Sequence, residues 1–144
     1  MAAATNDAGG RPGQRFPRLV VIVVGAIFIA FGVWALAAPR TFYDTVAVFE
    51  PYNQHFIHDI GAFQMGLGGV LLLAAFFGDA LFVALAGVAV GATAHLLAHI
   101  VDRDLGGTPA SDIPFLTIIA LALIAGALTR APFRRSARAD APGA

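Results

Sequence analysis

Cysteine and lysine are absent from this chain of 144 residues, and charged side chains are scarce. Without cysteine, the chain has no disulfides, no thiol catalysis and no thiolate metal sites. Charged residues make up 12% of the chain, whereas a soluble domain carries about 25%. The mean hydropathy is +0.78. These shortages argue against a soluble domain and predict a membrane protein.

Long runs without a charged side chain account for most of the apolar residues, and they cover 19–38, 60–77, 80–101 and 113–129. A helix of about 20 residues spans the roughly 30 Å hydrocarbon core of a bilayer. The sequence therefore predicts an all-α, polytopic membrane protein, a bundle of four transmembrane helices within residues 19–130. The helices are expected at about 19–38, 57–77, 80–101 and 113–130. Residues 1–18 and 131–144 are rich in Ala, Gly and Pro, and we expect them to be disordered cytoplasmic tails.

The first apolar run also resembles a signal peptide, because Ala35-Leu36-Ala37 is similar to a cleavage site. Its 20 residues exceed the usual apolar region of about 7–15 residues. We therefore expect this run to be retained as a membrane span.

Arginines flank the bundle at both ends of the chain. Three of them precede the first span and four follow the last, namely Arg11, Arg15, Arg18, Arg130, Arg134, Arg135 and Arg138. The positive-inside rule places both termini in the cytoplasm, so the loops 39–59 and 102–112 face outward. The predicted location is the bacterial cytoplasmic (inner) membrane, with the lipid bilayer as the main partner.

The loop 39–59 is amphipathic rather than polar throughout. Its apolar and aromatic residues favour a short element lying at the membrane interface, where aromatic side chains are enriched. Pro51 suits a first helical position, and Asn53 is an alternative N-cap for the second span. With either residue at its start, the helix of the second span is predicted to begin outside the hydrocarbon core of the membrane.

Glycines mark the faces where helices are expected to pack, because transmembrane helices associate through close contact between small residues. Gly87-x-x-x-Gly91 forms such a face on the third span, and two further steps of four residues reach His95 and His99. We therefore expect both histidines to face protein rather than lipid. Further glycines occur on the other spans, at Gly25, Gly32, Gly61, Gly66, Gly68, Gly69 and Gly126.

Histidines and acidic residues gather at the predicted outer side. If the second and third spans form a hairpin with its turn at Gly78-Asp79, residues at equal height have numbers that sum to about 157 or 158, given equal helical rise. His99 then lies level with Asp59, and His95 with Gln64. His58 falls off the face of Asp59 and is expected to be only interfacial.

This register predicts that His55-x-x-x-Asp59 and His95-x-x-x-His99 converge on one point. Residues four apart share a helix face, and imidazole with carboxylate suits Zn, Cu or Fe. Four further residues are expected as supporting or alternative ligands, namely Asn53, Gln64, Asp102 and Glu50. Two alternatives stay open: a metal-free polar network, and haem b held by two histidines, which needs a wide gap between helices.

Other functional classes find little support in the sequence. Ser111 and Ser136 have no histidine nearby in the sequence, so no nucleophile motif is expected. The terminal arginines lack interleaved aromatic residues, which argues against nucleic-acid binding. The apolar midplane and the lack of repeats argue against transport by a monomer.

Three segments resemble a known group of proteins. They are Pro39-Arg40-x-Phe42-Tyr43-Asp44, Pro51-Tyr52-Asn53-x-His55-x-x-x-Asp59-x-Gly61-Ala62 and His95-Leu96-x-x-His99. They are similar to a group of small bacterial four-helix integral membrane proteins that is broadly DoxX-like. The resemblance covers roughly residues 19–130. It implies a four-helix bundle and no established activity. Its pattern carries over to Asn53, His55, Asp59, His95 and His99, whereas at the position of His58 the group more often has arginine.

Two functional hypotheses follow from these patterns. The leading one is a membrane protein with an outward-facing His/Asp site that binds a transition metal for redox chemistry or metal handling. The competing one is a non-enzymatic accessory subunit of a larger membrane complex or a homo-oligomer, in which the His/Asp network is structural. Neither hypothesis assigns an enzymatic reaction to the chain.

Overall fold

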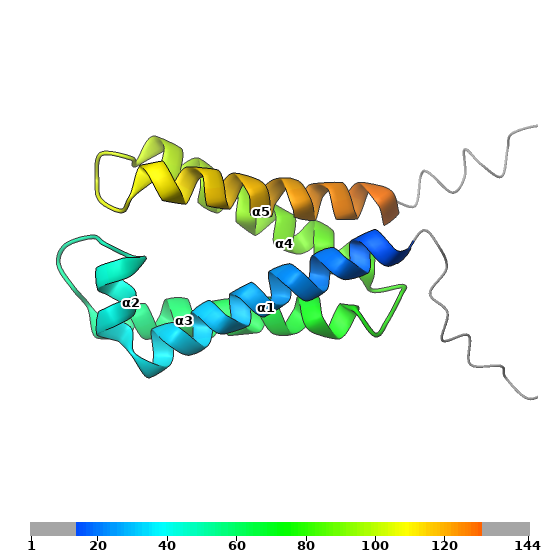
Figure 1. The fold of residues 1–144 in the computed structure, drawn as a ribbon, viewed down its shortest axis with the longest axis horizontal. Helices are drawn as coiled ribbons and strands as arrows, with labels where there is room; N and C mark the ends of the chain where they lie inside the picture. The colour runs from blue at the N-terminus through cyan, green and yellow to red at the C-terminus, as the bar shows by residue number, and fades with distance from the viewer. Residues whose placement is uncertain (1–13, 131–144) are drawn as a thin grey trace, which may run out of the picture.

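In the computed structural model, which describes residues 14–130, the chain is helical apart from its turns and loops. The helices, labelled in Figure 1, are α1 (Arg15–Ala37), α2 (Pro39–Thr45), α3 (Gln54–Ala74), α4 (Leu81–Val101) and α5 (Pro109–Arg130). The predicted all-helical class is therefore confirmed. The expected tails at 1–13 and 131–144 lie outside the described residues, whereas residues 15–18 belong to α1.

Four of these helices, α1, α3, α4 and α5, are long and apolar enough to cross a membrane. Their outward faces carry large apolar side chains, with Phe63 75% exposed and Val83 71% exposed. Such side chains are unfavourable in water and favourable against lipid tails. The chain is accordingly a multi-pass membrane protein.

Local sequence signals explain where the helices begin and end. The side chain of Asn53 accepts a hydrogen bond from the amide of Phe56 and caps α3, so the predicted N-cap is confirmed. Pro39 occupies the first turn of α2, where its missing amide costs nothing. The turn at 75–80 contains Gly78 and Asp79, as expected, although α3 ends at Ala74.

The helices pair into two layers rather than forming the expected hairpin of α3 with α4. In Figure 1, α1 and α3 form one layer, with α2 at its end, and α4 and α5 form the other. Contacts within each pair are far more numerous than those between α3 and α4. The layers lie close at the end that carries Arg15 and Arg130, and they diverge toward α2.

Glycines bring α1 and α3 into main-chain contact. A Cβ atom added at Gly32 would lie 2.7 Å from the carbonyl oxygen of Gly61. A Cβ atom added at Gly68 would lie 2.8 Å from the carbonyl oxygen of Gly25. Both distances are shorter than real Cβ contacts, so these positions require glycine. The small-residue packing expected for the spans is therefore present in this layer.

The glycine face predicted on α4 is wrong. Among residues 14–130, added Cβ atoms at Gly87 and Gly91 would have no atom within 4 Å, so neither glycine is a close-contact position there. The buried residues of α4 form an adjacent stripe instead, at Leu81, Ala84, Leu85, Val88, Ala89 and Ala92. Aliphatic side chains, rather than glycine pairs, hold α4 in the bundle.

Two apolar clusters stabilise the bundle. The larger one unites all four long helices toward the Arg15 end, around fully buried Val21, Leu71, Leu85 and Leu123. The smaller one joins α1, α2 and α3 at the other end, and its buried members are Ala35, Phe42, Tyr43 and Ile57. The second layer contributes no member to this smaller cluster. The space between the layers near α2 is therefore left for a cavity.

Candidate functional site

A cavity of about 630 Å³ lies between the two layers at the α2 end. Its wall combines residues of α1, α2, α3, α4 and α5 with the loops that follow α2 and α4. Most of the wall is apolar, and its polar members are Glu50, Gln64, His95, His99, Asp102 and Asp112. A large apolar cavity with a few polar groups is the usual form of a small-molecule site.

His95, His99 and Asp112 form a chain of polar contacts in this wall. The Nε2 atoms of the two histidines are 3.1 Å apart, so one ring donates a hydrogen bond to the other. The Nδ1 atom of His99 lies 3.7 Å from a carboxylate oxygen of Asp112. The side chain of His99 is 30% exposed and that of Asp112 is 17% exposed. This cluster is the polar centre of the cavity.

The position of the two histidines follows from the buried stripe of α4. Starting at Leu85, steps of three and four residues lead through Val88, Ala92 and His95 to His99. This spacing keeps residues on one face of a helix. Both histidines lie in the cavity wall, although His95 is exposed, and they extend the aliphatic stripe and not the glycine one. Beyond Ala92 the two layers diverge, so the residues that continue the stripe line the cavity instead of packing in the core.

The first turn of α5 holds Asp112 in place. One oxygen of its carboxylate accepts a hydrogen bond of 2.7 Å from the amide of Thr108. The other accepts a bond of 3.2 Å from the hydroxyl of Ser111. The first of these bonds satisfies an amide at the helix start that has no partner within the helix. The carboxylate beside His99 is thereby fixed in position.

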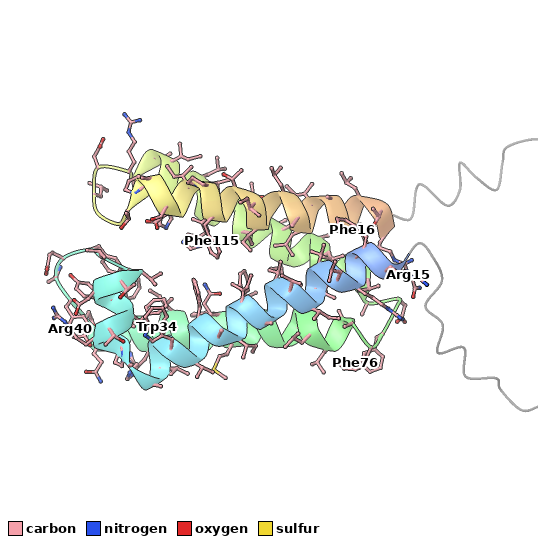
Figure 2. All side chains as sticks on the ribbon, viewed as in Figure 1. Arg15, Phe16, Trp34, Arg40, Phe76 and Phe115 are labelled. Carbon is pink, nitrogen blue, oxygen red and sulfur yellow. The ribbon has the colours of Figure 1, made fainter. Side chains whose placement is uncertain are left out.

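Aromatic rings line the apolar part of the cavity. Phe31 on α1 and Phe115 on α5 are stacked, with ring centroids 5.8 Å apart, and so connect the two layers. Figure 2 shows Phe115 extending from α5 toward the layer of α1. Further rings in the wall come from Phe28, Phe42, Phe49 and Phe56. The cavity therefore presents many ring faces to an occupant.

Two loops meet at the α2 end of the cavity. The amide of Gly107 donates a hydrogen bond to the carbonyl of Val48. Gly106 has φ = 142°, and a Cβ atom there would lie 3.0 Å from the carbonyl oxygen of Val48. Only glycine readily adopts this backbone conformation in so close a contact. This loop contact places Glu50 and Asp102 in the same wall.

Gln64 is the polar residue of the cavity that lies near the middle of α3. Its Oε1 atom is buried and has no hydrogen-bond partner within residues 14–130. The predicted equal height of Gln64 and His95 is consistent with the position of both in one wall. A hydrogen-bond donor placed in the cavity would satisfy this acceptor.

His55 and Asp59 do not join the histidines of α4. They pair with each other at 3.7 Å, and the side chain of His55 is 87% exposed. Neither residue lines the cavity. Within residues 14–130, no group of three or more His, Asp or Glu side chains is arranged to hold a metal ion. The predicted convergence of these four residues is therefore not found, because α3 diverges from α4 at this end.

The supporting residues predicted from sequence fall into two groups. Glu50, Gln64 and Asp102 line the cavity, whereas Asn53 caps α3. Asp112 was missed as a partner of His99. The pattern Thr108-x-x-Ser111-Asp112 is a helix-start signal, and it marks the carboxylate as part of α5 rather than of a free loop.

Comparisons with protein-family models, with curated proteins and with solved structures find no match to this chain. The resemblance to the DoxX-like group consequently stays a prediction from the quoted segments.

Proposed function

We propose that this membrane protein binds a small, largely apolar molecule in the cavity between its two layers. The observation that carries this proposal is the cavity itself: about 630 Å³, aromatic, and bordered by the cluster of His95, His99 and Asp112. A packed bundle gains stability by filling such a space with side chains. An empty cavity therefore lowers the stability of the bundle. A bound ligand restores that stability.

The polar cluster orients the bound molecule. The apolar body lies among the phenylalanines, and its polar end lies beside His95 and His99. The contact of its Nδ1 atom with Asp112 holds the imidazole of His99 in one orientation, and its Nε2 atom contacts His95. By the positive-inside prediction, this polar end is in the outer half of the membrane.

The test is the binding of 1-aminoanthracene, a neutral aromatic fluorophore, to the purified full chain in detergent. Ala98 lines the cavity, so Ala98→Phe is expected to weaken binding at least tenfold. Leu116→Trp obstructs the same space from α5. Ala94 is on the same helix but outside the wall, and Ala94→Phe is expected to leave binding unchanged. Equal binding by all three variants would contradict the proposal.

A second candidate function is the binding of a transition metal at His95 and His99. The 3.1 Å between their Nε2 atoms favours it, because two nitrogens that share one metal at about 2.0–2.1 Å are separated by a similar distance. Asp112 would then orient His99 through its other nitrogen. Remaining ligands would come from water or from the bound molecule.

Metal analysis of the purified protein tests this second function. The double variant His95→Ala/His99→Ala is expected to lose bound Zn, Cu or Fe, which the wild type retains. The matched control is His55→Ala/His58→Ala, which removes two histidines outside the cavity. Negligible metal in the wild type, or equal metal in both double variants, would exclude this function.

A further inference from the structure

The acidic residues of the cavity have no arginine to neutralise them. Glu50, Asp102 and Asp112 belong to its wall, and within residues 14–130 no arginine does. Two arginines lie near this end of the bundle, and each forms an ion pair elsewhere. Arg40 contacts Asp44 at 3.0 Å and Arg103 contacts Asp104 at 3.7 Å.

The remaining arginines of the described chain are distant from this site. Arg15 and Arg18 begin α1 and Arg130 ends α5, at the opposite end of the bundle. Within residues 14–130, the basic side chain paired with a carboxylate of the wall is His99, whose Nδ1 atom lies 3.7 Å from Asp112, and no arginine of the wall compensates Glu50 or Asp102. Charges in a low-dielectric surrounding interact more strongly than charges in water, and a recess lined by one sign of charge attracts the opposite one.

The aromatic wall is complementary to the same kind of ligand. Six phenylalanines line the cavity, and a ring face attracts a cation whose centre lies within about 6 Å of it. The Oε1 atom of Gln64, which has no hydrogen-bond partner in the described part of the chain, adds a further acceptor. Carboxylates, ring faces and amide oxygen all disfavour an anionic ligand.

We propose that the molecule bound in this cavity is a lipophilic cation, whose charged group lies near Glu50, Asp102 and Asp112 and whose apolar body contacts the phenylalanines. This inference rests on the proposed function and specifies the chemical class of the ligand. Amines and quaternary cations with apolar substituents belong to this class, whereas fatty acids and other lipophilic anions do not.

The test uses two probes of nearly the same shape and opposite charge. Radiolabelled tetraphenylphosphonium and tetraphenylborate are compared by equilibrium dialysis against the full-length protein in neutral detergent. Saturable binding of tetraphenylphosphonium, without saturable binding of tetraphenylborate, is expected. Comparable or tighter binding of the anion would overturn the inference.

Variants locate the binding of the cation. Glu50→Gln/Asp102→Asn removes two charges from the wall and leaves the helix-capping Asp112 intact, and it is expected to weaken tetraphenylphosphonium binding at least tenfold. Asp59→Asn/Asp104→Asn removes two charges that lie outside the wall, and it is expected to leave that binding within twofold. Equal effects of the two double variants would overturn the inference.

The two proposals fail in distinguishable ways. If 1-aminoanthracene binds in a manner sensitive to Ala98→Phe but tetraphenylphosphonium does not bind, the cationic class is wrong and the cavity still has a ligand. If neither probe binds, the proposed function and the inference are both wrong.

Discussion

Tyr43 shows how a single residue contributes to the α2 end of the bundle. Its ring is 3% exposed in the cluster of α1, α2 and α3, with the ring of Tyr52 at 5.0 Å. The guanidinium of Arg40 lies 5.3 Å from its ring centroid. Burial raises the pKa of the Tyr43 hydroxyl above its ordinary value, and the carboxylate of Glu50 raises it further. The folded protein therefore favours the neutral phenol.

This pKa shift predicts a loss of stability in alkali. Stability from the neutral phenol is fully present below the unfolded-state pKa of about 10 and is lost as the pH rises through the higher folded-state pKa. Tyr43→Phe cannot ionise, so its unfolding temperature is expected to fall less than that of the wild type between pH 9 and about pH 11. Thermal unfolding in detergent, followed by circular dichroism, measures the difference. Parallel declines of both proteins would contradict this assignment.

Individual residues also show which contacts can be predicted from the sequence and which cannot. The N-cap at Asn53 is predictable because a cap depends on local chain geometry. The contact of His99 with Asp112 is not, because it depends on how α4 and α5 pack and on α5 beginning at Pro109. A histidine pair at a spacing of four residues gives a shared face, but its partner is set by tertiary structure.

At the scale of elements, α1 and α3 differ from α4 and α5 in how they pack. In the first pair, glycines of one helix lie against main-chain carbonyls of the other, and in the second pair aliphatic side chains meet. In the second pair, a Cβ atom at Gly126 would lie 3.1 Å from a methyl group of Leu85. A methyl group yields more readily than a main-chain carbonyl. The first pair is therefore the less tolerant of substitution.

Glycine substitutions test this difference. Gly32→Ala places a Cβ atom 2.7 Å from a main-chain carbonyl oxygen, and overpacking of this kind typically costs about 1–3 kcal/mol. Gly66→Ala is the control, because its Cβ would have no atom within 4 Å. The control is expected to be neutral or to stabilise by up to about 1 kcal/mol, since alanine has the higher helix propensity. Unfolding in mixed detergent micelles measures both values, and a neutral Gly32→Ala would refute the close contact.

Helix existence was easier to predict than helix pairing for a physical reason. The four spans follow from the length and polarity of the runs, which the bilayer itself dictates. Pairing depends on which faces fit together, and in lipid both faces of a span are apolar. The short turn at Gly78-Asp79 suggested that α3 packs on α4, but the glycines of α1 give α3 a closer neighbour. The error in pairing then displaced His55 and Asp59 from the predicted site.

At the scale of the molecule, two layers share a large apolar core at one end and a cavity at the other. The stacked rings of Phe31 and Phe115 are a direct contact between the layers on the cavity side. Access to the cavity therefore depends on the separation of the layers at that end. A ligand that spans them is expected to hold them together.

Cross-linking tests the layer arrangement, and the absence of native cysteine makes it specific. Phe31→Cys/Phe115→Cys is expected to react rapidly with o-phenylenedimaleimide within one chain. Phe63→Cys/Phe115→Cys is the control, because Phe63 is 75% exposed on the outer face of α3. The product is identified by mass spectrometry after proteolysis. Equal yields from both pairs would show that α1 and α5 do not face each other.

The glycine contacts between α1 and α3 also bear on the ancestry of the chain. Gly25 faces Gly68 and Gly32 faces Gly61, so each helix carries two glycines seven residues apart. Contacts between main-chain atoms constrain these four positions while leaving the identity of the surrounding apolar residues free. Divergent relatives are then expected to keep the paired glycine spacing after most other similarity is lost. A search for that spacing in two antiparallel spans is a route to relatives that overall sequence similarity misses.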